Sequence, residues 1–292
     1  SVSRGLGDVY KRQGVKDEDI VRTNEVAEAD KAMDEGKYVA TTNSNLISQC
    51  RPVEVAIDAT GVPDVGAKVA TNAINNKKHV VMLNVETDVV IGPLLDKMAK
   101  DNGVIYTGSA GDEPGAVMEL YDFATAMGLE VKVMGKGKNN RIDKNCNPDT
   151  VLEEATRRKM SPKMLCAFKD GTKTMVEMTA MSNATGLVPD VIGGHGIASD
   201  VKSLNETYKL KEDGGILKQH GVVEYVNGIA PGVFVTVATD NEEIAYQMQY
   251  HSMGPGPLWT LYRPYHLCNL ETPLTAAKVV IDGEPTIVPK LS

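Results

Sequence analysis

The sequence predicts an α/β protein whose first 110 residues form a parallel sheet with crossover helices. Short apolar runs at residues 53–58, 78–83 and 103–107 are separated by helix-length intervals. Strands that are apolar along their whole length and alternate with helices are typical of parallel sheets, because both faces of such sheets are covered. We therefore predict a doubly wound parallel sheet over the first part of the chain.

The carboxyl ends of these runs are where a ligand is expected. Small or polar residues follow each run, and open α/β sheets bind ligands at the carboxyl ends of their strands. The candidate cofactor-binding residues at these ends are Thr60, Gly61, Asn84, Ala110 and Gly111.

Caps and breakers define the other elements of this part. Gly36 is a typical helix stop, and residues 42–45 form a candidate cap for a short helix before Cys50. The predicted helices are 18–36, 63–77 and 92–102, and the predicted additional strand is 37–41.

After a helix at 114–127 and a strand at 130–135, the alternation of strands and helices breaks down. The later predictions are helices at 150–159 and 174–184, antiparallel strands at 222–226 and 232–239, a short helix or loop at 263–270 and a final strand at 276–281. This mixed pattern predicts a second domain, of α+β type, over residues 113–292.

Residues 14–112 are predicted to be the C-terminal part of a dinucleotide-binding Rossmann domain. Such domains open with a strand and a Gly-x-Gly-x-x-Gly turn that holds pyrophosphate at a helix N-terminus. The nearest candidate, Gly5-Leu-Gly7-Asp-Val-Tyr10, lacks the third glycine and a preceding strand. We interpret residues 1–13 as a non-native leader, with native sequence beginning near Gly14, so the first βαβ segment of the fold is expected to be absent.

Composition excludes several classes of protein. The net charge of −8 and the lack of long basic stretches argue against nucleic-acid binding. The apolar runs are too short to cross a bilayer and no signal peptide is visible, so we predict a cytoplasmic protein without a membrane partner. The four cysteines are widely spaced, which favours reduced thiols over a disulfide framework or a zinc site.

The loop at residues 108–115 is the first candidate site. Its small residues allow a close approach to a ligand, and Asp112 and Glu113 stand at the start of the next helix. Glu113 is a candidate catalytic residue. The alternative is that both carboxylates only offset the helix dipole.

The loop at residues 135–140 is the second candidate site. Lys136 and Lys138, set among glycines and amides, can surround a phosphate or polarise a carbonyl oxygen. We predict a catalytic role for Lys136 and substrate binding by Lys138 and Asn139. A solvated basic turn is the alternative.

Asp170 and Lys173 form the third candidate site. Asp170 is predicted to cap a helix, which places Lys173 in its first turn against the helix dipole. The dipole and burial would lower the pKa of Lys173, which suits a proton donor or acceptor. An ordinary i,i+4 ion pair with Glu177 is the competing explanation.

Two further residues are candidates for substrate binding. His195 is flanked by glycines and therefore open to a ligand, although a lone histidine is more often structural. Arg263 lies beside a rigid Pro-Tyr-His turn and is suited to bind an anion, but a structural arginine is about as common.

These segments together resemble one family across residues 18–289, the 1-deoxy-D-xylulose 5-phosphate reductoisomerase-like oxidoreductases, which are related to homoserine dehydrogenase. The resemblance is carried by Ile57-Asp-Ala-Thr-Gly61, Val81-Met-Leu-Asn84, Gly111-Asp-Glu-Pro114, Gly135-Lys-Gly-Lys-Asn-Asn140, Asp170-Gly-Thr-Lys-Thr-Met-Val-Glu-Met178, Thr185-Gly-Leu-Val-Pro-Asp190, Gly232-Val-Phe234 and Arg263-Pro-Tyr-His266.

The resemblance implies an NAD(P)-binding Rossmann domain, a catalytic α+β domain that also forms a homodimer, and often a small C-terminal SAF-type domain. It implies hydride transfer at a carbonyl or hydroxyl group of a small anionic substrate, such as a sugar phosphate or polyol acid. NADP is favoured over NAD by the resemblance alone. By analogy with homoserine dehydrogenase, Lys173 would be the acid/base residue, although its spacing from Asp170 differs from that enzyme's.

Two other functions agree with the same residues. One is a homoserine-dehydrogenase-like amino-acid oxidoreductase, and the other is a non-catalytic sensor or scaffold that binds NAD(P). Metal dependence is left open, because Asp112, Glu113 and Asp190 would be ligands only if they converge in space.

We predict that the 292-residue chain binds NAD(P)H only weakly and is inactive as it stands, because it has no recognisable pyrophosphate loop. Titration followed by nucleotide fluorescence measures this affinity. Sub-micromolar binding would show that the cofactor site has been assigned to the wrong residues.

Overall fold

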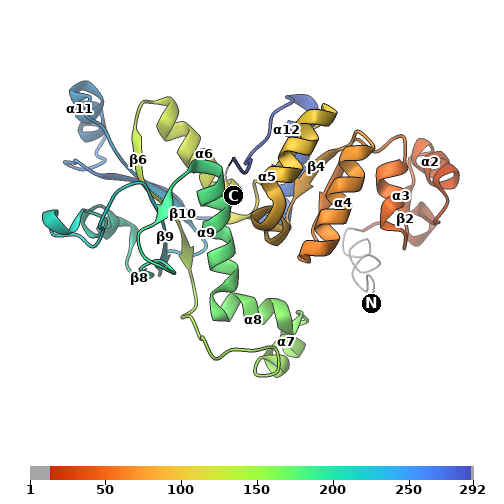
Figure 1. Cartoon of the computed structure of the whole chain (residues 1–292), viewed down its shortest axis with the longest axis horizontal. Helices are drawn as coiled ribbons and strands as arrows, with labels where there is room; N and C mark the ends of the chain where they lie inside the picture. Colours follow the sequence, from red (N-terminus) through yellow and green to blue (C-terminus); the bar gives the residue numbers. More distant parts are fainter. Residues whose placement is uncertain (1–13, 291–292) are drawn as a thin grey trace.

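The computed structural model describes residues 14–290 (Figure 1). The predicted non-native leader, residues 1–13, and the Gly5–Tyr10 loop candidate lie outside the described residues. None of the helices described is both long and apolar enough to span a membrane.

A three-stranded parallel sheet forms the centre of the first half. Its order is β3 (Val55–Asp58), β4 (His79–Met82) and β5 (Tyr106–Gly108). The helices α4 (Pro63–Asn75) and α5 (Val85–Asn102) connect these strands and pack against them in one apolar cluster. The predicted α/β fold with a parallel sheet and crossover helices is confirmed.

Helix α5 is longer than its sequence pattern suggested. It begins at Val85 because the side chain of Asn84 accepts a hydrogen bond from the backbone N–H of Thr87 and caps the helix. Pro93 lies inside the helix, where it removes one backbone donor without ending it. The prediction placed the start near this proline, whereas the cap lies two turns earlier.

Residues 17–40 form two short parallel strands joined by a helix, where a single long helix was predicted for residues 18–36. After the short η1 (Asp17–Asp19), β1 (Ile20–Arg22) pairs with β2 (Tyr38–Ala40), and α2 (Val26–Asp34) connects them. The β-branched Ile20 and Val21 favour this strand, which the acidic residues before them had masked in the sequence. The helix α3 (Ser44–Gln49) follows, and the side chain of Asn43 caps it as predicted.

The second half is built on a larger mixed sheet in the order β11-β10-β6-β9-β7, in which β8 also pairs with β9. Its strands are β6 (Glu130–Lys138), β7 (Val188–Pro189), β8 (Ile197–Ala198), β9 (Val222–Asn227), β10 (Val233–Ala238) and β11 (Trp259–Arg263).

Strand β6 lies in the middle of this sheet and separates the two strands that we predicted as antiparallel partners. β9 pairs with β6 in parallel, and β10 pairs with the other edge of β6 in antiparallel. Both strands are buried on both faces, so their side chains do not alternate between polar and apolar. The prediction of two strands that run in opposite directions was right, but the strands are not neighbours in the sheet.

Both faces of the larger sheet are covered. The helices α6 (Glu113–Ala126) and α9 (Thr172–Thr185) pack on one face around Met134 and Val235. Tyr208 and Leu217, from the segment between β8 and β9, pack on the other face. That segment holds η2 (Val201–Ser203), α10 (Leu204–Thr207) and η3 (Lys211–Asp213), and α11 (Glu242–Tyr250) connects β10 to β11.

Two helices project from the body of the protein between β6 and α9 (Figure 1). They are α7 (Leu152–Arg158) and α8 (Pro162–Asp170), the second of which was not predicted from the sequence. This α7–α8 projection has a small core of its own around Val151, Ala155 and Leu165.

The C-terminal residues return to the first sheet. The predicted short helix or loop at 263–270 contains η4 (Cys268–Leu270). The predicted strand at 276–281 is instead part of helix α12 (Thr272–Ile281), whose buried residues Thr272, Thr275 and Val279 recur at helical spacing. Ile287 then bridges to Gly108 at the end of β5. Residues 272–290 therefore pack beside the sheet formed by the first half of the chain.

The loop after β5 depends on a glycine at position 111. A Cβ atom there would stand 1.8 Å from the carbonyl oxygen of Cys268, and the backbone N–H of Cys268 donates a 2.8 Å hydrogen bond to the Gly111 oxygen. Two backbone segments thus meet at Gly111 with no room for a side chain.

We predict that Gly111→Ala lowers the free energy of unfolding by about 3 kcal/mol or more, because backbone must move to relieve the overlap. Gly103→Ala is the comparison, since Gly103 has a φ of 70° but open space around it, and costs about 1–2 kcal/mol for the left-handed backbone alone. Urea unfolding measures both. A loss for Gly111→Ala no larger than that for Gly103→Ala would contradict the prediction.

Candidate active site

A central cavity of about 780 Å³ lies where the two sheets and the α7–α8 projection meet. Ala59, Gly61 and Leu83 line it from the carboxyl ends of β3 and β4. The end of β6 lines the opposite wall, and Met164 and Phe168 of α8 close a third side. One cavity therefore combines the ligand-binding end of the parallel sheet with the end of the central strand of the second sheet.

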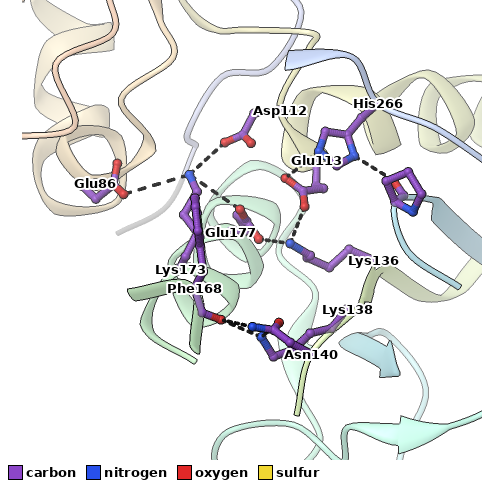
Figure 2. A network of polar contacts seen from close by, with 11 residues as sticks. Glu86, Asp112, Glu113, Lys136, Lys138, Asn140, Phe168, Lys173, Glu177 and His266 are labelled. Atoms are coloured by element: carbon purple, nitrogen blue, oxygen red, sulfur yellow. Dashed lines mark hydrogen bonds and ion pairs between the residues drawn. The ribbon is translucent and has the colours of Figure 1, made fainter. Parts of the chain in front are cut away.

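Lys136 is a buried cation at the wall of this cavity. It is 5% exposed, and its ammonium group donates to the carboxylates of Glu113 and Glu177 (Figure 2). Glu113 comes from the first turn of α6 and Glu177 from α9, whereas Lys136 is on β6. The three elements are thus held together by one buried cation between two carboxylates.

Lys173 occupies a second position in the same network. Its Nζ atom lies 3.2 Å from Asp112 Oδ2, 3.6 Å from Glu177 Oε1 and 4.0 Å from Glu86 Oε1. Burial opposes its charge, but these carboxylates outweigh burial and raise the pKa of Lys173 above its ordinary value. The lowered pKa predicted from the helix dipole is wrong, because three carboxylates outweigh one helix terminus.

The carboxylates of the network differ in their affinity for protons. Burial, with Glu113 nearby, raises the pKa of Glu177 to about 8, although Lys136 and Lys173 act against it. Burial also raises the pKa of Asp112 to about 6, against the opposing effect of Lys173. The pKa of Glu113 is well below its ordinary value, because Lys136 overcomes the effect of its burial. Glu177 and Asp112 are therefore the carboxyl groups that exchange protons near neutral pH.

His266 adds a third cation. Its Nε2 atom lies 3.5 Å from Glu113 Oε2, and its Nδ1 atom lies 2.7 Å from the carbonyl oxygen of Pro231. Burial lowers the pKa of His266, but its contacts with Cys268 and Glu113 outweigh burial and raise it to about 9. With Glu177 protonated, three carboxylates (Glu86, Asp112 and Glu113) face three cations.

Lys138 differs from the other two lysines because it has no carboxylate partner among the described residues. It is 5% exposed, and its Nζ atom donates to Asn140 Oδ1 at 2.8 Å and to the Phe168 carbonyl oxygen at 2.9 Å. Burial, together with Lys136, lowers its pKa. A buried ammonium group held only by neutral acceptors is suited to bind an anion.

The sequence of β6 explains why both lysines reach the cavity. Lys136 and Lys138 alternate with Gly135 and Gly137, so they project from the same face of the strand. A Cβ atom at Gly137 would stand 2.3 Å from the backbone nitrogen of Ala230. The glycines therefore allow neighbouring backbone to pack against β6 while the lysines face the cavity.

Of the predicted cofactor-binding residues, only Gly61 lines the central cavity. Asn84 is fully buried and donates to Asp58 Oδ2 at 2.9 Å, so it fixes the strand ends and offers no group to a ligand. The Thr60 hydroxyl accepts from Asn84. Ala110 and Gly111 face the C-terminal segment, where the Ala110 N–H donates to Thr275 Oγ1 at 2.9 Å.

Three other predicted site residues lie outside the central cavity. Asp170 ends α8 and accepts a 2.7 Å hydrogen bond from the Thr172 N–H. His195 binds Asp190 at 2.7 Å, and its backbone N–H donates to the buried carboxylate of Glu224, which explains the glycines around it. Arg263 is paired with Glu271 at 2.9 Å and Glu119 at 3.3 Å. The Asp170 contact lies at the start of α9, as the predicted cap required, although the N-cap residue itself is Gly171. The contacts of His195 and Arg263 are not revealed by the sequence alone.

Lys136, Lys138, Asn139, Glu113 and Lys173 do line one cavity. Sequence reasoning gave no site role to Glu86, Glu177 or His266. Glu177 lies four residues after Lys173, and this spacing was interpreted only as a surface ion pair, although Glu177 is in fact buried.

Ligand atoms of Asp112, Glu113 and His266 lie within 4.8 Å of one another, a spacing that a metal ion could use. Asp190 is not among them and binds His195 instead. Asp112 and Glu113 already pair with Lys173 and Lys136.

Comparison with known protein families shows to which family the chain belongs. Residues 111–272, more than half of the chain, match the family described as "Oxidoreductase DRL, catalytic domain". The chain belongs to this family. It is an oxidoreductase, and the matched residues contain most of the charged network.

Solved structures with similar folds are distant in sequence. A homoserine dehydrogenase from Thiobacillus denitrificans is 16% identical, with 99% of this chain and 73% of that chain covered and a TM-score of 0.47. A probable dehydrogenase from Thermotoga maritima is 14% identical, with 94% and 83% covered and a TM-score of 0.41. The 1-deoxy-D-xylulose 5-phosphate reductoisomerase from Zymomonas mobilis, in complex with NADPH, is 15% identical, with 61% and 47% covered and a TM-score of 0.38. No curated protein matches the chain.

We predict that Lys136→Met destabilises the protein by about 3–5 kcal/mol, because it removes the nearest cation from the buried carboxylate of Glu113 and, within the described chain, the only cation from one oxygen of Glu177. Lys97→Met is the matched control, since Lys97 forms an exposed pair with Asp101 and its loss costs less than about 1 kcal/mol. Urea unfolding at neutral pH measures both. Equal, small effects of the two substitutions would contradict a structural role for Lys136.

Proposed function

We propose that this oxidoreductase is NAD(P)-dependent and transfers a hydride to or from the carbon of a carbonyl or hydroxyl group in a small anionic substrate. One observation carries the proposal: the central cavity joins the carboxyl ends of a parallel sheet to a buried network of lysines and carboxylates. The carboxyl ends of a parallel sheet are where α/β proteins bind dinucleotides. The network of lysines and carboxylates can bind the substrate oxygen and transfer a proton to or from it.

The strand ends fit a flat, apolar-faced group. Gly61 has a φ of 62°, and it lines the cavity together with Ala59 and Leu83, so small and apolar surface is presented there beside the carboxylate of Glu86. A nicotinamide bound at this wall would supply the hydride. Met164 of the α7–α8 projection stands opposite Gly61 and would exclude water from the same place.

Lys173 is the residue that we assign to the reacting oxygen. It is charged at neutral pH, because its pKa is raised, and it lines the cavity. Its ammonium group can donate to the substrate oxygen and pass a proton to it. Glu177, 3.6 Å away and with a pKa of about 8, holds a proton at neutral pH and can then return it to Lys173.

Lys136 and Lys138 have separate roles in this proposal. Lys136 is bound by Glu113 and Glu177, and we assign it the positioning of both carboxylates beside Lys173. Lys138 has no carboxylate partner among the described residues, and with the exposed Asn139 it is suited to hold the anionic group of the substrate.

Within this class, the sequence resemblance supports a reductoisomerase-like substrate, that is, a sugar phosphate or polyol acid, with NADP as the favoured cofactor. The unpaired Lys138 supports the anionic character of that substrate. A substrate screen distinguishes this proposal from a homoserine-dehydrogenase-like activity.

With the substrate that the screen identifies, we predict that Lys173→Ala lowers kcat by about a hundredfold or more, the usual scale for loss of an acid/base group. Lys173→Arg does not restore kcat, because arginine does not release its proton at working pH. Lys163→Ala, on the exposed side of α8, is the control with unchanged kcat.

Steady-state kinetics and NAD(P)H binding are measured on the same proteins. The enzyme proposal requires turnover to fall while cofactor affinity stays within about twofold. A protein with no turnover for any substrate in the screen, but intact NAD(P)H binding, would instead be a nucleotide sensor or scaffold.

A further inference from the structure

A second hollow, of about 520 Å³, lies on the other side of the loop that follows β6. We call it the Arg141 groove. Its lining residues are Lys138, Asn139, Asn140, Arg141, Gly196, Ala198, Asn227, Gly228 and Ala230. The residues from Lys138 to Asn140 and Ala230 also line the central cavity, so the two spaces adjoin.

The charge of this groove is opposite to that of the protein as a whole. Lys138 and Arg141 are its only charged lining residues, whereas the chain carries a net charge of −8. No carboxylate of the described residues lies within ion-pair distance of either side chain. The central cavity, by contrast, is lined by four carboxylates of its network.

Several donors in the groove have no partner within the described part of the chain. The side chains of Asn139 and Arg141 are exposed and form no hydrogen bond or ion pair there. Lys138 uses two of its three N–H donors, on Asn140 Oδ1 and the Phe168 carbonyl oxygen, and the third is free. A guanidinium, an ammonium and an amide therefore offer free donors along one short loop.

The walls leave room for a ligand to approach these donors. Gly196, Ala198, Gly228 and Ala230 carry no side chain beyond Cβ. Asn227 donates to the Gly196 carbonyl oxygen at 2.8 Å and so joins the two walls. Gly228 has a φ of 119°, and a Cβ atom there would stand 3.0 Å from the Ser199 oxygen. The groove is therefore shaped by small residues and fixed by hydrogen bonds.

We propose that the Arg141 groove binds a phosphate or carboxylate group through Arg141 and Lys138. A planar guanidinium can bind such an anion with two parallel hydrogen bonds, and the unpaired Lys138 adds a second charge. This anion is either the end of a substrate that extends from the central cavity past Lys138 or a separate small anion. The first case rests on the proposed function, and the second does not.

In the first case the groove constrains the substrate class. Lys136 and Lys138 are two residues apart on an extended strand, and Arg141 lies beyond them, so the anionic group stands roughly 7 Å or more from the network of Lys136. The substrate would then be an extended molecule with its reacting carbon at one end and its anionic group at the other.

Binding of inorganic phosphate tests the groove without any enzymatic turnover. Calorimetric titration is performed at constant ionic strength, with sodium chloride replacing phosphate in the reference. We expect saturable binding that Arg141→Glu weakens on the order of tenfold or more, the scale of a lost charged hydrogen bond. Lys144→Ala, which removes an exposed cation from the same loop but not from the groove, leaves binding unchanged.

Two results would contradict the proposed site. One is that the unaltered protein does not bind phosphate, and the other is that the Arg141→Glu protein binds phosphate with the same affinity as the unaltered protein. Circular dichroism shows whether Arg141→Glu is folded, and because Arg141 is exposed, Arg141→Ala provides a second, milder variant. Either variant weakening phosphate binding in a folded protein supports the site.

Steady-state kinetics with the substrate then distinguish the two sources of the anion. If added phosphate raises the KM for the substrate without changing kcat, and Arg141→Ala likewise raises this KM and leaves kcat unchanged, the groove holds the substrate's own anionic group. If phosphate binds through Arg141 but leaves KM unchanged, the groove binds a separate anion. Arg141-dependent phosphate binding in a protein without turnover supports the groove while contradicting the proposed function.

Discussion

The buried ammonium group of Lys136, held between Glu113 and Glu177, is the interaction on which the rest of this structure depends. It joins the first turn of α6, the end of β6 and the second turn of α9 at one point. A buried ion pair contributes little net stability compared with apolar packing, but the loss of one partner is costly. Its main effect here is therefore positional, because three elements must meet in one arrangement to pair these charges.

This constraint divides the cavity into two electrostatic regions. Near the strand ends, Lys173 lies among Glu86, Asp112 and Glu177. Together with Lys136, His266 and Glu113, this network is close to charge balance when Glu177 is protonated. Beyond Lys136, Lys138 has no counter-charge among the described residues. The first region suits the transfer of protons, and the second suits the binding of a charged group.

The C-terminal segment gives the two sheets a fixed relation. Thr272 shares a 2.9 Å hydrogen bond with Ser109, and the hydroxyl of Thr107 accepts from the N–H of Thr286 at 2.9 Å. These bonds hold the loop after β5, which carries Asp112, against residues from the end of the chain. Asp112 and Lys173 meet at 3.2 Å because both sheets are held in this way.

The sequence by itself determined the class of the fold and the lysines of the site, together with Glu113 and Asn139. The apolar runs indicated β3, β4 and β5, and the lysines between glycines indicated a charged site, because these patterns are local. The predicted loop at 135–140 is in part the end of β6, which continues to Lys138. Only the tertiary structure decided the pairing of β1 with β2, the insertion of β6 between β9 and β10, and α12 in place of a strand, since each depends on contacts between distant residues. The tertiary structure also decided which charged residues belong to the site. Arg263 and His195 are paired with nearby carboxylates outside the cavity. Lys173 is surrounded by three carboxylates, which raise its pKa where a lowered pKa was expected. A pKa is set by all the charges near a group, and the sequence shows only those that are close along the chain.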